Sequence, residues 1–467
     1  MTDRHTTILR KTMLTSMLSL CCTYSFALEA LSDQALSNST GEGIAILPEN
    51  FKMVFQTAED GLTAAQNQSR LANRNYDTGF IRFIPVGPLS ETAKTAGAKK
   101  ADVFLYGLAL SASDSNLNSR FSNLGFNWGQ ETNPWVFSVK SISTTANRVV
   151  YDFAGVAQDF SYLSLEAPYV LDGAANTATD NNIKLGLWGD FFARNPLVAA
   201  SVDAKNGAPA NLNGLDQRLR LQLVANGLSL NGSNLKLFQT LGGAASSSLP
   251  TSYNNTLGLA ALIRLNTNDN PSTATTEDKS KALRISTAES LTTDINNDLT
   301  TPAISKTAAP NFNANDGVYL YSPNINLVLG SVYQPLIVDT AADGQNFVIE
   351  LTRIPNKANV YQQIYTDYTA LTSGTTSAYK GSTCNVQYCG DAISMGQTYQ
   401  GNTATHSSIS IGTVGFTDSS NRFLKADTSN NAVGVSFVTP TGTKTNLGSA
   451  AIDGVLIQHL KITTTGL

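Results

Sequence analysis

The sequence is poor in charged residues, in histidine and in cysteine, and each shortage narrows the classes of protein to which the chain can belong. Only 14% of the 467 residues are charged, compared with about 25% in an ordinary soluble domain. Lysine and arginine together number 31 against 35 acidic residues, so the chain has no basic excess with which to bind nucleic acid. Three histidines leave little material for a histidine-based active site.

Motifs of common catalytic and cofactor sites are also missing. The sequence contains no G-x-S-x-G elbow, no H-E-x-x-H pair, no P-loop and no dinucleotide-binding glycine fingerprint. Residues 294–298 alternate oxygen ligands as a calcium loop does, but Leu299 and Ser305 stand where an EF-hand requires glycine and glutamate. His406 and His459 are interpreted as hydrogen-bonding surface residues. We therefore predict a non-enzymatic protein that holds no cofactor and no metal.

The first 27 residues have the regions of a secretory signal peptide. Basic residues up to Lys11 precede a short apolar run over 13–24, which is too short for the ~20 residues of a membrane span. Ser25 and Ala27 then place small residues at both positions that a signal peptidase reads. We predict cleavage between Ala27 and Leu28, and an exported protein, periplasmic or at the cell surface, that contacts the membrane only during export.

Cysteine is confined to two short sites. Cys21 and Cys22 leave with the signal peptide, which leaves Cys384 and Cys389 in the mature chain. A single pair in an exported chain predicts a structural disulfide. Free thiols are the alternative, because a metal site would need two further ligands and none stands nearby.

Apolar and polar residues alternate along much of the chain after residue 47. The clearest alternation covers 102–110, 135–141, 218–224 and 257–265. Asn-Gly and Asp-Gly pairs such as Asn231-Gly232 can supply the positive φ of tight turns. This pattern predicts antiparallel strands with one buried face. The fold class that follows is mostly β, an antiparallel β-sandwich or jelly-roll-like body with a few short helices.

The remaining segments complete the predicted organisation. We expect a signal peptide over 1–27, a short N-terminal helical segment over 28–46 and a β-rich body over 47–467. Helical spacing within the body is limited to 62–74 and 360–368, and long polar loops are expected near 266–279, 302–315 and 371–406.

Two other classes of β-protein remain open. Alternating strands also build outer-membrane β-barrels, although aromatic residues make up only 8% of this chain and barrels carry aromatic girdles at both interfaces. A carbohydrate-binding or carbohydrate-cleaving β-sandwich is the other alternative, because tryptophan rings stack on sugars. Trp128 follows Phe126-Asn127 in a glycine-rich loop and is the best candidate for such stacking, whereas Trp135 suits a core.

The N-terminal segment LEALSDQALSNSTGEGI carries a family resemblance. It resembles the start of the Fil-type pilus-system proteins of Gram-negative bacteria, which share a Leu-Ser/Asp-Asp-x-x-Leu-Ser segment ending in Gly-x-Gly. The matching residues are Leu31, Ser32, Asp33, Leu36, Ser37, Gly41 and Gly43. Further segments in the style of the family are 282–287, 317–330 and 347–356. The resemblance implies a surface or pilus role and supplies no catalytic residues.

These observations together lead to one functional hypothesis. We expect an exported structural or adhesive protein of a pilus-like surface system, whose partners are other pilus-system or cell-envelope proteins and surface glycans. Shaft subunit, tip adhesin and assembly factor fit the sequence equally well.

The processing site gives the first testable prediction. Intact-mass measurement of the exported protein is expected to place the mature N-terminus at Leu28, because Ala27 completes the small-x-small site. A mass that retains residues 1–27, or a lipid-modified cysteine, would contradict the assignment.

Overall fold

The computed structural model describes most of the β-rich body. The described residues are 43–51, 53–54, 80–83, 100–129, 131, 134–145, 149–168, 182–194, 215–267, 276–290, 311–341, 343–365, 404–416 and 424–464. Within them almost all regular structure is antiparallel strand, accompanied by short helices. The predicted mostly-β fold with a sandwich-like antiparallel body is therefore confirmed.

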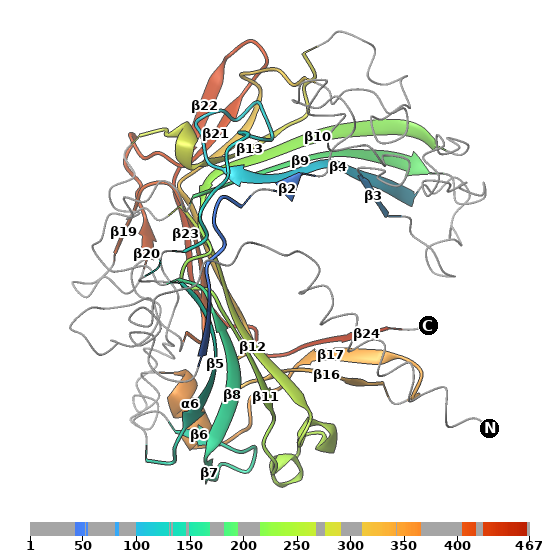
Figure 1. The fold of residues 1–467 in the computed structure, drawn as a ribbon, viewed down its shortest axis with the longest axis vertical. Helices are drawn as coiled ribbons and strands as arrows, with labels where there is room; N and C mark the ends of the chain where they lie inside the picture. Colours follow the sequence, from blue (N-terminus) through green and yellow to red (C-terminus); the bar gives the residue numbers. More distant parts are fainter. Residues whose placement is uncertain are drawn as a thin grey trace.

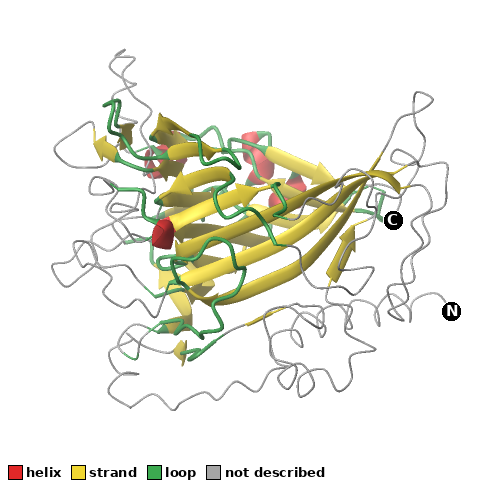
Figure 2. Cartoon of the chain, turned by 90° about the horizontal axis from the view of Figure 1, so that it is seen from above, coloured by secondary structure: helices red, strands yellow, loops and turns green. Residues whose placement is uncertain are grey.

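One of the two large sheets has nine strands in the described part of the chain. Its order is β2-β4-β9-β10-β13-β14-β21-β22, with β3 paired to β4. It lies across the top of Figure 1, and Figure 2 shows its long strands side by side from above. The strands are β2 (Met53–Val54), β3 (Phe80–Phe83), β4 (Lys100–Ala112), β9 (Ile183–Arg194), β10 (Leu215–Leu228), β13 (Ala282–Ser286), β14 (Gly317–Tyr321), β21 (Val435–Val438) and β22 (Lys444–Gly448).

The other large sheet has eleven described strands. In Figure 1 its strands β5, β8, β11 and β12 run down the page, and β16, β17 and β24 run across its lower part. Its order is β1-β5-β8-β11-β12-β15-β18-β23, and β16 joins β12 to β17, which pairs with β24. The strands are β1 (Gly43–Ile46), β5 (Trp135–Ile142), β8 (Phe160–Glu166), β11 (Asn234–Gln239), β12 (Leu257–Asn266), β15 (Pro323–Leu329), β16 (Leu336–Thr340), β17 (Phe347–Leu351), β18 (Ser407–Ile411), β23 (Ala450–Val455) and β24 (Leu460–Thr463).

Smaller elements complete the described structure. They are the strand pairs β6 (Val150–Tyr151) with β7 (Ala157–Gln158) and β19 (Val414–Phe416) with β20 (Leu424–Ala426), the helix α6 (Ala358–Ile364), and the 3₁₀ turns η3 (Ala244–Ser247), η4 (Thr251–Tyr253) and η6 (Lys279–Lys281). The helix α6 overlaps the predicted helical segment 360–368 but begins two residues earlier and ends at Ile364. Residues 43–46, the end of the predicted N-terminal helical segment, form the strand β1 instead, and 28–42 lie outside the described residues.

The two sheets are joined by strands that pass from one into the other. β10 leads into β11 through the turn at Gly232, β14 leads into β15 through Ser322, and β22 leads into β23 through Gly448. All three residues have positive φ, at +78°, +45° and +80°. A left-handed residue between two extended segments turns the chain sharply, so each crossing strand bends where it changes sheet.

The core is divided between the two sheets. On the nine-stranded sheet, Phe104, Trp188 and Tyr319 belong to one buried cluster. On the eleven-stranded sheet, the α6 residues Val360 and Ile364 pack into a second cluster with side chains of β8, β11 and β12. Val360 and Ile364 lie four residues apart, on one face of the helix, and both are buried.

The strands alternate as predicted, but in several of them the more apolar row of side chains is the more exposed one. Leu219 of β10 is 53% exposed and Val139 of β5 is 63% exposed, whereas the neighbouring Arg220 and Ser138 are 7% and 8% exposed. On the nine-stranded sheet the buried side includes a set of polar residues that we name the polar row: Lys184, Asp190, Arg218, Arg220, Gln222, Asn226, Arg284 and Ser286.

An ion-pair cluster satisfies the charges at the centre of the polar row. The Arg220 guanidinium donates to both carboxylate oxygens of Asp190 at 2.8 and 3.1 Å, and its Nη1 donates to Glu289 at 3.1 Å. Arg218 donates to the other oxygen of Glu289 at 3.2 Å. Two cations therefore face two anions, which is the arrangement that makes a buried charge tolerable.

Because the polar row is buried and the neighbouring apolar side chains are exposed, we predict that a polar substitution and an apolar substitution in β10 have unequal effects on stability. Arg220→Met leaves Asp190 buried without its bidentate cation and is expected to lower the free energy of unfolding by ~3–5 kcal/mol. Leu219→Asn, one residue away, is expected to change it by less than about 1 kcal/mol because Leu219 is exposed. Urea unfolding of both variants makes the comparison.

A double variant serves as the control for the ion pair. Arg220→Met combined with Asp190→Leu removes both charges, so part of the lost stability should return. A larger loss from Leu219→Asn than from Arg220→Met would mean that the apolar row is the one that stabilises the sheet.

Candidate functional site

The residues that the sequence singled out are only partly visible in the structure. Ala27, Leu28, Cys384 and Cys389 lie outside the described residues, so processing and the disulfide stay predictions. Among the described residues no group of histidine, cysteine and acidic side chains is arranged to hold a metal ion.

Trp128 lies inside an aromatic cluster that joins the two sheets near β1 and β2. Its ring centroid is 5.7 Å from Phe51, 5.5 Å from Phe126 and 5.4 Å from Trp135, the last two in edge-to-face geometry. Backbone hydrogen bonds between Phe51 and Phe126 hold the cluster together. These contacts favour packing as the role of the half-buried Trp128, and sugar stacking by this ring stays a prediction.

The two histidines of the body are placed differently. His406 is buried, its Nδ1 lies 2.8 Å from the Thr405 hydroxyl, and its ring packs edge-on against Tyr365. His459 is partly exposed, and its Nε2 lies 2.9 Å from Glu350 Oε1. His406 thus belongs to the packed interior beside α6, so the prediction that it is a surface residue was wrong. His459 belongs to a polar cluster.

Glu350 of β17 is the centre of that cluster. The Tyr253 hydroxyl donates to it at 2.6 Å and Lys461 of β24 lies 3.5 Å from its second oxygen. Burial by itself would raise the pKa of Glu350, but the hydrogen bonds from Tyr253 and His459 and the charge of Lys461 hold that pKa below its usual value. The ionised carboxylate therefore ties η4, β17 and the C-terminal strand together.

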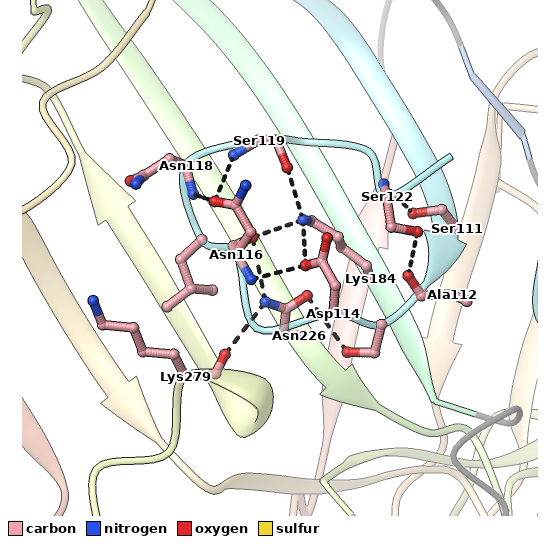
Figure 3. Close-up of polar contacts among 12 residues, drawn as sticks. Ser111, Ala112, Asp114, Asn116, Asn118, Ser119, Ser122, Lys184, Asn226 and Lys279 are labelled. Carbon is pink, nitrogen blue, oxygen red and sulfur yellow. Dashed lines mark hydrogen bonds and ion pairs between the residues drawn. The ribbon is translucent and has the colours of Figure 1, made fainter. Parts of the chain in front are cut away.

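The polar row of the nine-stranded sheet is covered by residues 113–122, which we name the covering segment. Figure 3 shows the Lys184 ammonium, from β9, enclosed by this segment. It donates to Asp114 Oδ1 at 2.6 Å, to the Asn116 carbonyl at 2.6 Å and to the Ser119 hydroxyl at 3.0 Å. Burial lowers the pKa of Lys184, and the bond to Asp114 opposes that effect.

Two further features hold the covering segment on the sheet. Arg284 of β13 donates to the Leu117 carbonyl at 3.2 Å and to the Asn118 side chain. Gly186 of β9 leaves room for the backbone of Arg120, because a Cβ at residue 186 would lie 2.3 Å from the Arg120 carbonyl oxygen. The polar row is thus a structural interior whose hydrogen bonds are directed at loops of the same chain.

The opposite side of each sheet carries a continuous surface that we name the apolar face. On the nine-stranded sheet one line of directly opposed residues runs Leu187, Leu223, Ile285, Val318 and Phe437. On the eleven-stranded sheet one line runs Val139, Leu163, Leu237, Leu259 and Leu336, and another runs Leu265, Ile325, Ile409 and Ile452. Register alone places these side chains next to one another on one face.

Several members of the apolar face are strongly exposed. They are Ile81, Leu219 and Phe437 on the nine-stranded sheet, and Phe137, Val139, Leu257, Ile263, Val338, Phe347, Ile409, Ile452, Leu460 and Ile462 on the eleven-stranded sheet. Such a surface offers mainly apolar packing area, with polar groups such as the Ser141 and Ser161 hydroxyls among the apolar side chains. It is suited to binding another apolar surface and unsuited to acid–base chemistry.

Sequence reasoning found these residues but missed their exposure. The exposure of the apolar face could have been inferred from the charged residues that alternate with it. Arg218 and Arg220 stand in one strand, and Lys184 and Asp190 stand in the strand beside it. So many charges along neighbouring strands can be buried only where they face one another and loop carbonyls.

Comparison of the chain with protein-family models, with curated proteins and with solved structures finds no match. No helix among the described residues is both long enough and apolar enough to span a membrane.

The Glu350 cluster predicts a pH dependence. Because the pKa of Glu350 is lower in the folded than in the unfolded chain, its contribution to stability is present above pH ~4.5 and is lost as the pH falls through the folded value. The difference in free energy of unfolding between the unmodified protein and Glu350→Gln should therefore shrink below pH ~4.5. Glu131→Gln, at an exposed position, is the control and should give a difference that stays small at every pH; a constant gap for Glu350→Gln would contradict the prediction.

Proposed function

We propose that this protein is an exported, non-enzymatic structural or adhesive component of a pilus-like surface assembly, and that its apolar face binds another strand-rich subunit of that assembly. The observation that carries the proposal is the apolar face of the eleven-stranded sheet. Register aligns two lines of apolar side chains on it, one from Val139 on β5 to Leu336 on β16 and one from Leu265 on β12 to Ile452 on β23. The N-terminal resemblance to pilus-system proteins supports the same role.

The energetics favour a covered apolar face. Full burial of an aliphatic side chain contributes ~1.5–3 kcal/mol, and residues such as Leu257 and Ile452 are more than half exposed. Contact with a second apolar surface would recover this free energy over many residues at once. Extended apolar patches on a protein surface are typical of sites at which another molecule binds.

The edges of the sheets offer a complementary means of assembly. Among the described strands, β24 pairs with β17 alone, and its side chains Leu460 and Ile462 are exposed. An exposed strand edge can accept a strand of another chain through main-chain hydrogen bonds. A strand-rich partner can therefore use both the edge and the apolar face beside it.

The test is a comparison of matched charge substitutions. Val139→Asp and Leu257→Asp place a carboxylate on the apolar face, and Val156→Asp places one at an exposed apolar position in the turn between β6 and β7. All three variants should be exported and folded, because all three positions are exposed. Only the first two should be depleted at least tenfold from sheared surface material, and they should no longer co-purify with the assembly.

Two outcomes would overturn the proposal. Unchanged amounts of Val139→Asp and Leu257→Asp in the surface fraction would show that the apolar face makes no contact in the assembly. An unmodified protein that requires detergent for extraction, with both variants released in soluble form, would identify lipid as the partner of the apolar face.

A further inference from the structure

A cavity lies on the buried side of the eleven-stranded sheet, opposite the apolar face. Its walls come from β8, β11 and β12, from residues 330–333 after β15 and from residues 404–405 before β18. Its volume is about 70 Å³, several times the ~10–15 Å³ that one water molecule requires. The cavity is therefore large enough for a small organic molecule.

Two neighbouring polar side chains of β11 line this cavity. Asn234 and Lys236 are each 7% exposed and project on the same side of the strand. The amide nitrogen of Asn234 is fully buried and has no hydrogen-bond partner among the described residues. A buried donor without an acceptor costs ~1–3 kcal/mol, so the cavity contains a donor that an oxygen-bearing ligand would satisfy.

The charges around the cavity favour an anion. Glu166 of β8 accepts from Lys140 with its two oxygens at 2.6 and 2.7 Å and from the Ser164 hydroxyl at 2.8 Å. Among the described residues, the Glu166 carboxylate thus stands beside two ammonium groups, Lys140 and Lys236. The Lys236 ammonium also lies 5.6 Å from the centre of the Tyr162 ring, within the range of a cation–π contact.

The titration behaviour of this cluster agrees with its geometry. Burial lowers the pKa of Lys236 to about 8, with Glu166 opposing and Lys140 adding to the effect. Burial also raises the pKa of Tyr162 to about 12, so its hydroxyl remains protonated at neutral pH. An anion in the cavity would offset the desolvation of the ammonium group.

We propose that this cavity is a binding site for a small aliphatic monocarboxylate. The carboxylate accepts hydrogen bonds from Asn234 Nδ2 and Lys236 Nζ, and the short alkyl chain packs against Ile142, Leu262 and Val332, which also line the cavity. Donors at one end and apolar side chains at the other match an amphipathic ligand of this kind. This site is independent of the apolar face and of the proposed assembly function.

Thermal unfolding and calorimetric titration with sodium propionate test the proposal, with sodium chloride at equal ionic strength as the salt control. Propionate should raise the melting temperature of the unmodified protein in a saturable manner. Asn234→Asp and Lys236→Met should each weaken propionate binding at least tenfold, because each removes a charge-assisted partner of the carboxylate. Lys425→Met, at an exposed position of β20, should bind propionate as the unmodified protein does.

The pH dependence of binding supplies a second readout that needs no variant. Propionate requires the protonated ammonium of Lys236, so its affinity should fall as the pH rises through about 8. Binding near pH 8 should also be accompanied by proton uptake. Absence of saturable stabilisation, an affinity that is the same at pH 7 and pH 9.5, or unchanged binding by Asn234→Asp would overturn the proposal.

Discussion

The bidentate ion pair between Arg220 and Asp190 is the interaction on which the arrangement of the nine-stranded sheet depends. It joins β10 to β9 in the middle of the sheet, and Glu289 extends it to Arg218. A buried charge is stable only with its partner in place. The side of the sheet that carries Arg218, Arg220 and Asp190 must therefore be the buried side, even though the side chains on the opposite side are more apolar.

This constraint explains why loops rather than a second sheet cover the polar row. Lys184 and Arg284 have hydrogen-bonding capacity that apolar side chains cannot satisfy, and backbone carbonyls of Asn116, Leu117 and Asn313 satisfy it. Loops expose carbonyl groups that strands use in their ladders. The interior of this sheet thus consists of charged side chains and backbone carbonyl groups as well as the buried cluster that contains Phe104, Trp188 and Tyr319.

The apolar face is the other consequence of the same arrangement. Side chains alternate strictly between the two sides of a strand, so when Arg218, Arg220 and Gln222 turn inward, Leu219 and Leu221 must turn outward. The same holds on the eleven-stranded sheet, where Ser138 is buried and Val139 is exposed. One surface of each sheet is therefore both apolar and exposed, and this is the observation on which the proposed contact with another subunit rests.

The sequence by itself determined the class of fold. Period-two alternation and Asn-Gly or Asp-Gly turns predicted antiparallel strands, and helical spacing around Val360 predicted the one described α-helix, because both signals are local. Only the tertiary structure decided which row is buried, since the partners of Arg220 and Arg284 stand far away in the chain, at Asp190, Glu289 and Asn118. Only the tertiary structure placed Trp128 in an aromatic cluster and brought Asn234 and Lys236 to one cavity. Alternation is a property of neighbouring residues, whereas the pairing of buried charges is a property of segments that meet only when the chain has folded.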